Sequence, residues 1–492
     1  MMRFMSSPSS IQRGTQRVSA LRQRPPLRII ADDNTLTPYG GTVVVGELCR
    51  RLGLVEGLDR AIDGVTRARP FKERRRGVSA GELLVSLAES MLVGGDAFND
   101  LEDLRGDDAG AELRAVADVP AASTAAQLAR RLRPSHLRAA EAALAGAGDL
   151  LDAGLGRDPA EPVTLDFDST LVEVYGRRKP GASRAHTGQL AYQPLLGVWA
   201  ERGRVLSAEL LSGSDSTRAD DTLALVRRAL ALLPAGHGHV GARFDAGFYR
   251  IELLRMLRHK SVSFSISVPR SSAMWRALAA IGEEGWAPAI DFPGAWVAEA
   301  AYAPEGWEHE PLRLVVRRVA FAADGLASDP RARRRRSIPP AQLSLVAAGE
   351  ATTAYGYSFL LSDMPGEPEL VEHHHRRRAQ IEERIKDHKL GVSLAHLPAS
   401  DLAANRTWLF ASQVALNILA MLCDLAFGPD PDDRLPRRRQ AKYLRRMLLC
   451  VPARVIHHAR QVILRLPAGL RWADDFARAY ARARGLPPPL AA

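Results

Sequence analysis

Two carboxylates stand two residues apart in the apolar segment LDFDST. In a β-strand, side chains two apart share a face, so Asp166 and Asp168 would point the same way. An acid inside an apolar strand is costly to bury without a cation or a hydrogen-bond donor. The pair therefore indicates metal ligands, with Asp168 as the main candidate and Asp166 as a secondary one. The alternative is that one of them caps a turn with Ser169 or Thr170.

Another carboxylate, Asp245, stands in ARFDAGFY, where an apolar strand ends and a glycine-containing turn begins. Open α/β sheets bind their ligands at the carboxyl ends of strands, which makes this position suitable for chemistry. The alternative interpretation is that Asp245 caps the helix that follows.

The segment HHHRRRAQIEERIKDHKLG supplies a further set. At about 100° per residue, one helix would place His375, Arg378, Glu382 and Lys389 on a single face. A carboxylate between cations suits a metal ligand beside side chains that hold phosphate groups. On spacing alone, an ordinary solvated helix with i,i+4 ion pairs is the better interpretation.

Clustered Asp and Glu residues are suited to cleavage of a phosphodiester. That reaction needs an activated oxygen nucleophile and stabilisation of charge on the leaving oxygen, and two divalent cations about 4 Å apart supply both. Mg²⁺ prefers hard oxygen ligands. This chemistry would be available if the three distant carboxylate groups met at one place.

The elements that must bring them together begin at Pro162. Apolar periodicity predicts a strand in 161–176, hairpin strands at 191–200 and 204–213, a helix at 214–234, a strand at 239–245, a helix at 248–260 and a strand at 261–269. Three meandering strands followed by alternating helix and strand form a mixed sheet with helices on its faces, the order of the ribonuclease-H-like fold. In that fold the fourth strand lies beside the first, which would bring Asp245 to Asp168.

Helical segments are expected on both sides of this core. Periodicity predicts helices in 43–62, 79–95, 123–132 and 134–148, with Ser79 and Ser123 as N-caps. They would form either a helix-turn-helix-like DNA reader or a bundle that only packs. Helix is predicted again from Leu370, and residues 407–427 are predicted to be a buried core helix.

Between the two parts of the core, residues 270–365 are expected to form a β-rich insertion, broken by Gly, Pro and an arginine run. The run Arg333–Arg336 is predicted to be a solvated loop, with a DNA contact as the alternative.

Positive charge is concentrated at both ends of the chain, whose formal net charge is +11 over 492 residues. The first 30 residues carry six Arg and no acid, and residues 434–492 carry fourteen Lys or Arg against Asp474 and Asp475. This pattern suits a protein that holds a polyanion at its ends and cations at its centre. The alternative is an Arg-rich protein without such a partner.

Other classes of protein are disfavoured. The three cysteines, Cys49, Cys423 and Cys450, are far apart, which argues against a disulfide framework or a cysteine zinc site and favours a reducing cytoplasm. The N-terminal segment lacks the apolar region of a signal peptide. No apolar run reaches the length of about 18 residues that a membrane span needs.

Taken together, LDFDST, RFDAGF and the Arg378, Glu382, Lys389 spacing resemble the DDE-type insertion-sequence transposases, in particular the DDE-domain group 1 family. Many relatives have a Tyr-(2)-Arg-(3)-Glu-(6)-Lys signature, and His375 stands here at the Tyr position. The resemblance runs from about Leu36 to Leu425.

The resemblance implies a catalytic, metal-binding triad of Asp168, Asp245 and Glu382, in which the register selects Glu382 over Glu383. It also implies Mg²⁺, with Mn²⁺ as a substitute, and DNA contacts from His375, Arg378 and Lys389. The partners would be double-stranded DNA, as terminal inverted repeats and target, with a dimer or higher oligomer on synapsed ends. No membrane and no organic cofactor are expected, and the bacterial nucleoid is the expected location.

The implied activity is cut-and-paste transposition. The alternatives are a ribonuclease-H-like nuclease without strand transfer and a catalytically inactive DNA-binding relative. A transition-metal site of His373, His374 and His375 is disfavoured, because adjacent helical residues point about 100° apart.

Six segments follow from these interpretations. They are a flexible basic arm (1–30), an N-terminal helical, DNA-binding domain (31–155), the first part of the catalytic core (156–269), the β-rich insertion (270–365), the second part of the core with the Glu-bearing helix (366–428) and a basic helical C-terminal region (429–492).

Overall fold

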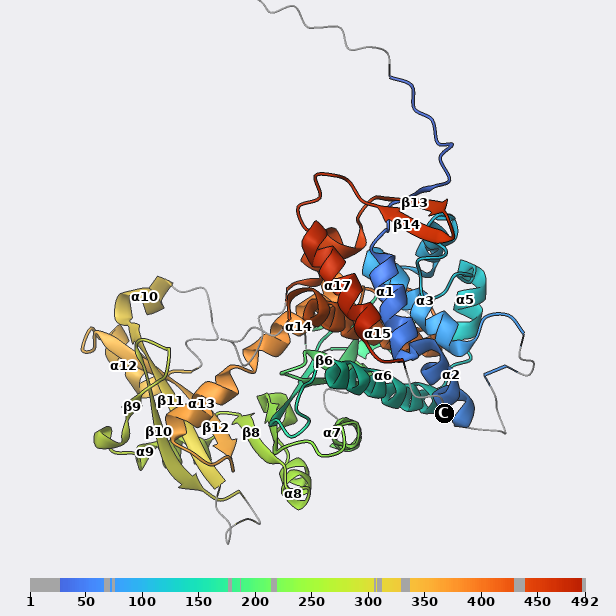
Figure 1. Cartoon of the computed structure of the whole chain (residues 1–492). Coiled ribbons are helices and arrows are strands. Elements are labelled where there is room, and N and C mark those ends of the chain that lie inside the picture. Colours follow the sequence, from blue (N-terminus) through green and yellow to red (C-terminus); the bar gives the residue numbers. More distant parts are fainter. Residues whose placement is uncertain are drawn as a thin grey trace, which may run out of the picture. The chain divides into compact units, whose positions relative to one another are not determined.

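A mixed β-sheet with helices on both faces confirms the predicted α/β architecture in this computed structural model (Figure 1). The structure describes residues 27–65, 71–72, 76–175, 179–185, 187–213, 219–304, 307, 312–328, 337–428 and 439–488. Every helix and strand of these residues lies in the compact unit Thr35–Ala492. Most of the predicted basic arm, residues 1–26, and the run Arg333–Arg336 lie outside the described residues.

The centre of the sheet has the strand order β6-β5-β2-β7-β8. Strand β7 runs parallel to both β2 and β8, whereas β5 is antiparallel to both β2 and β6. The bounds are β2 (Val163–Ser169), β5 (Leu190–Trp199), β6 (Arg204–Ser212), β7 (Val240–Phe244) and β8 (Ser263–Val268), with short strands β3 (Val172–Glu173) and β4 (Ser183–Arg184) beside β5. The predicted hairpin and the predicted pairing of the first strand with the strand that ends before Asp245 are both confirmed.

The alternation of side chains gives the sheet two differently covered faces. Leu165, Phe167 and Phe244 share a hydrophobic core with α7 (Ala219–Ala231) and α8 (Ile251–His259). The rings of Phe167 and Phe244 stack there, with centroids 4.9 Å apart. Asp166 and Asp168 point to the opposite face, because they alternate with Leu165 and Phe167 along β2. That face is covered by α6 (Pro134–Gly154), α14 (Ala379–Gly391) and α15 (Leu402–Phe427).

The predicted β-rich insertion lengthens the central sheet and does not form a sheet of its own. Its last strand pairs antiparallel with β8, from Phe359 opposite Val268 to Ser362 opposite Ser265. Beyond it the order continues through β11 and β10 to β9, so the described residues form a sheet of eleven strands. The bounds are β9 (Ala287–Pro288), β10 (Ala295–Tyr302), β11 (Leu312–Ala322) and β12 (Thr353–Ser362), with α9 (Ser272–Ala279), α10 (Ala323–Ser328) and α12 (Pro340–Ala347) between them.

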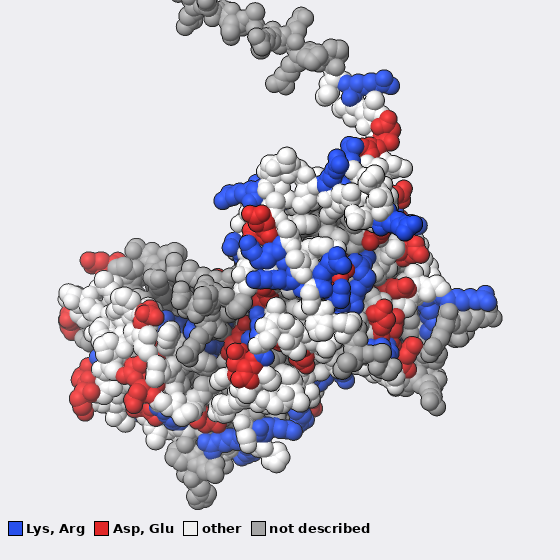
Figure 2. Space-filling view, in the orientation of Figure 1, with Lys and Arg blue, Asp and Glu red and all other residues white. Residues whose placement is uncertain are grey.

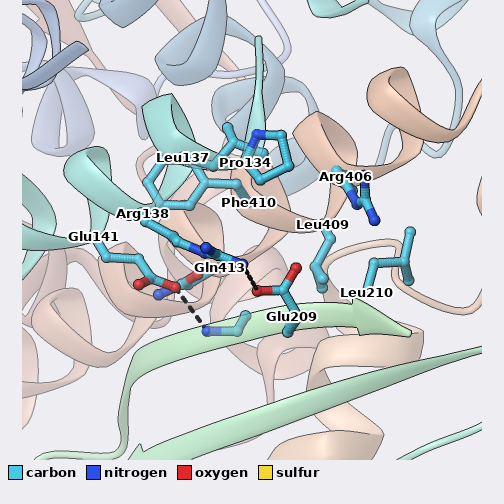
Figure 3. A pocket seen from close by; sticks show the side chains of 11 residues that line it. Pro134, Leu137, Arg138, Glu141, Glu209, Leu210, Arg406, Leu409, Phe410 and Gln413 are labelled. Carbon is cyan, nitrogen blue, oxygen red and sulfur yellow. Dashed lines mark hydrogen bonds and ion pairs between the residues drawn. The ribbon is translucent and has the colours of Figure 1, made fainter. Parts of the chain in front are cut away.

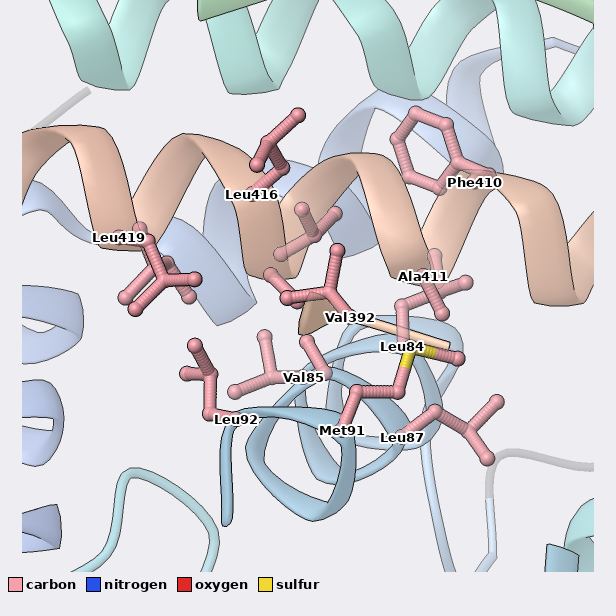
Figure 4. Close-up of a cluster of buried hydrophobic side chains, with 14 of the residues drawn as sticks. Leu84, Val85, Leu87, Met91, Leu92, Val392, Phe410, Ala411, Leu416 and Leu419 are labelled. Atoms are coloured by element: carbon pink, nitrogen blue, oxygen red, sulfur yellow. The ribbon is translucent and has the colours of Figure 1, made fainter. Parts of the chain in front are cut away.

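Helix α15 is the centre of the helical part. It is long and apolar enough to cross a membrane by composition, but its apolar 18-residue window is fully buried inside the protein, as the prediction of a core helix requires. Figure 4 shows its residues Phe410 and Leu416 in one hydrophobic cluster with Leu84 and Met91 of α3 (Ala80–Val93). Every α3 residue from Ala80 to Leu92 except Glu82 is buried, so this helix has no free face for a DNA groove.

The N-terminal helices differ in detail from the prediction. Ser79 caps α3 through a capping box with Glu82, as predicted, but Ser123 caps nothing, because α5 already begins at Ala122. The segment 43–62 forms two helices, since Gly53 adopts the left-handed conformation between them with φ = 57°. The remaining bounds are α1 (Thr42–Leu52), α2 (Leu54–Gly64), α4 (Leu101–Arg105) and α5 (Ala122–Ala129).

The C-terminal region contains a β-hairpin that the prediction of an all-helical region missed. Strands β13 (Ala453–His458) and β14 (Gln461–Arg465) form it, and β13 also pairs with β1 (Leu36–Thr37) near the start of the unit. Gly41 continues this junction by donating its N–H to the Leu449 carbonyl at 3.1 Å. Around the hairpin lie α16 (Ala441–Leu444), a π-helical turn (Arg445–Leu449) and α17 (Ala473–Gly485).

Candidate active site

The ends of β2 and β7 bring the two predicted aspartates together. In the parallel register, Asp166 lies opposite Arg243 and Phe167 opposite Phe244, so Asp168 and Asp245 are the next positions on neighbouring strands. Asp245 also caps the short 3₁₀ turn that follows β7, by accepting a hydrogen bond from the Gly247 N–H at 3.0 Å. Asp245 therefore lies at a strand end and also caps the following turn, as the two interpretations predicted.

Asp168 has an environment that disfavours its charged form. Burial raises the pKa of Asp168 to about 6, the Arg378 guanidinium opposes this rise, and the negative charges of Asp245 and Glu382 add to it. Its Oδ2 accepts from Arg378 Nη1 at 3.3 Å, and its Oδ1 accepts from the Ser169 N–H at 2.7 Å. Asp245 and Glu382 therefore both lie within electrostatic reach of Asp168, and Arg378 pairs with Asp168 from the helix side.

Glu382 is carried by α14, which is not continuous with the helix before it. The prediction of one helix with a single stripe is wrong, because a turn at Arg377 and Arg378 separates α13 (Pro368–Arg376) from α14. Arg378 is the N-cap residue of α14, and Glu382 lies in its first turn with an exposed side chain. A carboxylate in a first turn is stabilised by the helix dipole.

Lys389 lies two helical turns after Glu382 and points back to the segment behind Asp168. Its Nζ donates to Thr170 Oγ1 at 3.2 Å and to the Leu171 carbonyl at 2.8 Å. Burial lowers the pKa of Lys389 below its usual value. The side chain thereby ties α14 to the chain that leaves β2.

His375 lies on α13 and faces β8. Its Nδ1 is 2.8 Å from Ser265 Oγ, and its Nε2 is 3.0 Å from Ser267 Oγ. Burial lowers the pKa of His375 well below its usual value. Both ring nitrogens are used inside the protein, which favours a positioning role for His375. A contact from its ring to DNA stays a prediction.

The secondary candidate Asp166 is paired with an arginine that the sequence analysis missed. Arg243 is fully buried, and its Nε and Nη2 donate to the two carboxylate oxygens of Asp166 at 2.6 and 2.8 Å. Its Nη1 donates to the His374 carbonyl at 2.6 Å, which fixes the end of α13. The sequence contains a signal for this pair. Arg243 precedes Asp245 by two positions, as Asp166 precedes Asp168, so Arg243 and Asp166 lie on the same face of the sheet as the two candidate ligands.

The donor set fits a divalent ion by its chemistry. Asp168, Asp245 and Glu382 offer hard oxygen atoms, and their mutual repulsion at Asp168 is the kind that a cation offsets. In the described residues, however, no group of three or more His, Cys, Asp or Glu side chains is close enough to hold a metal ion. The guanidinium of Arg378 is the cation at Asp168 in this arrangement.

A pocket lies elsewhere, between α6, β6 and α15 (Figure 3). It encloses about 330 Å³ not filled by atoms, part of which is open solvent. Arg138 pairs with Glu209 across it at 3.1 Å, and Glu141 accepts from the Ala208 N–H at 2.8 Å. These contacts pair the charged groups on one side of the pocket, and its lining contains none of the three carboxylates.

Similarity to known proteins extends over most of the chain. The family model described as transposase DDE domain group 1 matches residues 19–488. No curated protein matches the chain. Among solved structures, a cryo-EM structure of a piggyBac transposase synaptic complex with hairpin DNA is similar, with 12% identity and a TM-score of 0.39, over 83% of this chain and 79% of that one.

Proposed function

Because the chain belongs to the transposase DDE domain group 1 family, we propose that it is a cut-and-paste DNA transposase with Asp168, Asp245 and Glu382 as its catalytic carboxylates. It would nick DNA at the transposon ends and join the freed 3′ ends to target DNA. Pairing of two ends requires at least two copies on DNA, so we include a dimer or higher oligomer, acting in the bacterial nucleoid, in the proposal.

One observation carries this assignment. The charges of Asp245 and Glu382 act on Asp168 although the three residues come from two strands and a helix far apart in the chain. Such convergence of like charges is costly for folding, and it is common at functional sites. The strand order β6-β5-β2-β7-β8, with the carboxylates at adjacent strand ends, supports a ribonuclease-H-like core.

The three carboxylates would hold Mg²⁺, or Mn²⁺ in its place. The chemistry that these ions supply when bound is activation of the attacking oxygen and stabilisation of charge on the leaving oxygen. The chain's own task is to orient the ligands. Asp166 is paired with Arg243, which supports a structural role under the site, and Lys389 and His375 hold α14 and α13 in place.

Arg378 is the residue best placed to contact DNA near the scissile bond. Its guanidinium lies 3.3 Å from Asp168 Oδ2, and its side chain is partly exposed. A guanidinium can exchange a carboxylate for a phosphate with little change in geometry, because its planar donors fit both. We include this exchange from Asp168 to a phosphate in the proposal.

The test is a cleavage and strand-transfer assay on duplexes that carry the inverted repeats of the element. Asp168→Ala, Asp245→Ala and Glu382→Gln should each abolish Mg²⁺-dependent cleavage and leave duplex binding intact. Glu383→Gln is the matched control, since Glu383 is the next residue on the same exposed helix turn, and it should retain cleavage.

Two results would change the assignment. Full cleavage in any of the three variants would remove that residue from the triad. Cleavage without joining, by the wild-type protein on paired ends, would favour a nuclease of the same architecture over a transposase.

A further inference from the structure

We propose that α16 and the residues around it form a binding surface for the phosphate backbone of double-stranded DNA, leading from the candidate active site. The surface, named here the α16 surface, consists of Lys442, Tyr443, Arg446, Arg471 and Trp472. The inference rests on the proposed function, since it names a path for the DNA that the site would cut.

The α16 surface is positively charged and open. Lys442, Arg446 and Arg471 have exposed side chains, and Tyr443 is 38% exposed. Within the part of the chain that the structure describes, none of the three cations forms an ion pair. Figure 2 shows Lys and Arg side chains gathered on the face where Figure 1 draws α17 and the other C-terminal elements in red.

The Trp472 ring contacts the two arginines without neutralising them. The guanidinium carbons of Arg446 and Arg471 lie 5.9 and 5.7 Å from the ring centroid of Trp472. The Tyr443 ring meets the Trp472 ring edge to face, with centroids 6.0 Å apart. A carboxylate partner would cancel the charge, whereas a ring positions the guanidinium and leaves its N–H donors free for phosphate oxygens.

Arg445, which precedes Arg446 in the same turn, has a structural role instead. It points inward and donates to the carbonyls of Leu92, Met91 and Gly391, which fixes the π-helical turn to α3 and to the end of α14. Arg446 points outward from the same turn. The turn therefore separates an anchoring arginine from one presented to solvent.

The α16 surface is attached directly to the helix that carries Glu382. Asp387 Oδ1 on α14 accepts a hydrogen bond from the Ala441 N–H, the first of α16, at 3.3 Å. Gly391 allows the close approach, because a Cβ there would lie 2.3 Å from the Cβ of Ala441. Glu382 and Asp387 are separated by about 8 Å along the helix axis and by about 140° around it. The α16 surface therefore adjoins the helix that carries Glu382 without sharing the face of Glu382, and in this proposal it binds the part of the duplex that extends beyond the cut.

The experiment measures binding of the full chain to a fluorescein-labelled duplex of random sequence, by anisotropy, over a series of KCl concentrations. Replacing Lys442, Arg446 and Arg471 together with Ala should weaken binding about 10- to 100-fold, and should lower the slope of log K against log salt by about 2 to 3. The variant in which both arginines become Lys should keep the wild-type slope.

Arg255→Ala is the matched control, because Arg255 is an exposed arginine on α8, on the other side of the sheet. It should leave affinity and slope unchanged, and a thermal melt shows whether each variant is folded. A folded triple variant with the wild-type affinity and slope would overturn the proposal. If the wild type cleaves DNA with metal and the triple variant binds as tightly as the wild type, the α16 surface is wrong and the proposed function stands. If the triple variant has a lowered salt slope but the wild type never cleaves DNA, the proposed function is wrong and the α16 surface stands.

Discussion

Arg243 and Asp166 form a two-point ion pair that is buried directly beneath the strand-end carboxylates. The two donor–acceptor distances are 2.6 and 2.8 Å, and neither side chain is more than 3% exposed. The third donor of Arg243 reaches the His374 carbonyl. Arg243 thus joins β7 to β2 and to α13. The pair therefore fixes the distance of α13, and of α14 that follows it, from the sheet.

Asp166→Asn should lower the free energy of unfolding by about 3–5 kcal/mol, because it leaves the Arg243 charge buried without its counter-charge. Urea denaturation measures this change. Asp168→Asn is the control at the partly exposed end of the same strand, and it should not destabilise the protein. If Asp166→Asn abolished cleavage without any loss of stability, Asp166 would be a metal ligand, which is the secondary role that the sequence analysis predicted for it.

Lys389→Met should slow metal-dependent cleavage about 10- to 100-fold, because loss of the bonds to Thr170 and Leu171 lets the Asp168 segment move. The salt slope of duplex binding should stay unchanged, since the Nζ is already bonded inside the protein. A drop of about 1 in that slope would show instead that Lys389 contacts a phosphate, as the family resemblance implies.

Glu89 should make stability depend on pH. Burial raises the pKa of Glu89 to about 7, and its Oε2 has no hydrogen-bond partner in the described residues. A carboxyl whose pKa is higher in the folded state binds more protons there, so stability falls as pH rises from about 4.5 to about 7. Glu89→Gln should therefore raise the free energy of unfolding by about 2–3 kcal/mol at pH 8 and change it little at pH 4. Equal effects at both pH values would contradict the raised pKa.

Two glycines should respond oppositely to replacement by Ala. A Cβ on Gly41 would lie 1.6 Å from the Leu448 carbonyl oxygen, so Gly41→Ala should destabilise the protein by about 3 kcal/mol. On Gly57, inside α2, the nearest neighbour is the Ala143 Cβ at 3.8 Å, an ordinary contact. Gly57→Ala should therefore stabilise by about 0.5–1 kcal/mol through the helix propensity of Ala. Thermal melts of both variants test the junction of Gly41 with the C-terminal turn.

The order of the core elements could be predicted from the sequence because each has strong local periodicity. The break of the helix at Arg377 and Arg378 could not, because both residues are good helix formers and the break results from tertiary contacts on α13 and α14. The C-terminal hairpin was missed for a related reason. Its two-residue turn, Ala459 and Arg460, adopts φ values of 48° and 64°, which hairpins normally assign to Asn and Gly.

The candidate site shows the same division. Asp168 and Asp245 could be predicted, since strand ends can be recognised locally and parallel neighbours place them side by side. Strand alternation places Arg243 on the carboxylate face, but its pairing with Asp166 could not be predicted, because it depends on which strands become neighbours. The continuation of the central sheet through β12 likewise depends on pairing between distant segments, which no local pattern encodes.

The pairing of β1 with β13 has a consequence for how the protein is made. Leu36 and Thr37 leave the ribosome long before their partners Arg454 and Ala453 are translated. Closure of contacts this distant in sequence is slow. The β1–β13 pair can form only after β13 has been translated, so β1 remains without this partner while the residues between the two strands are made. A polypeptide that stopped before β13 would leave β1 with nothing to pair with.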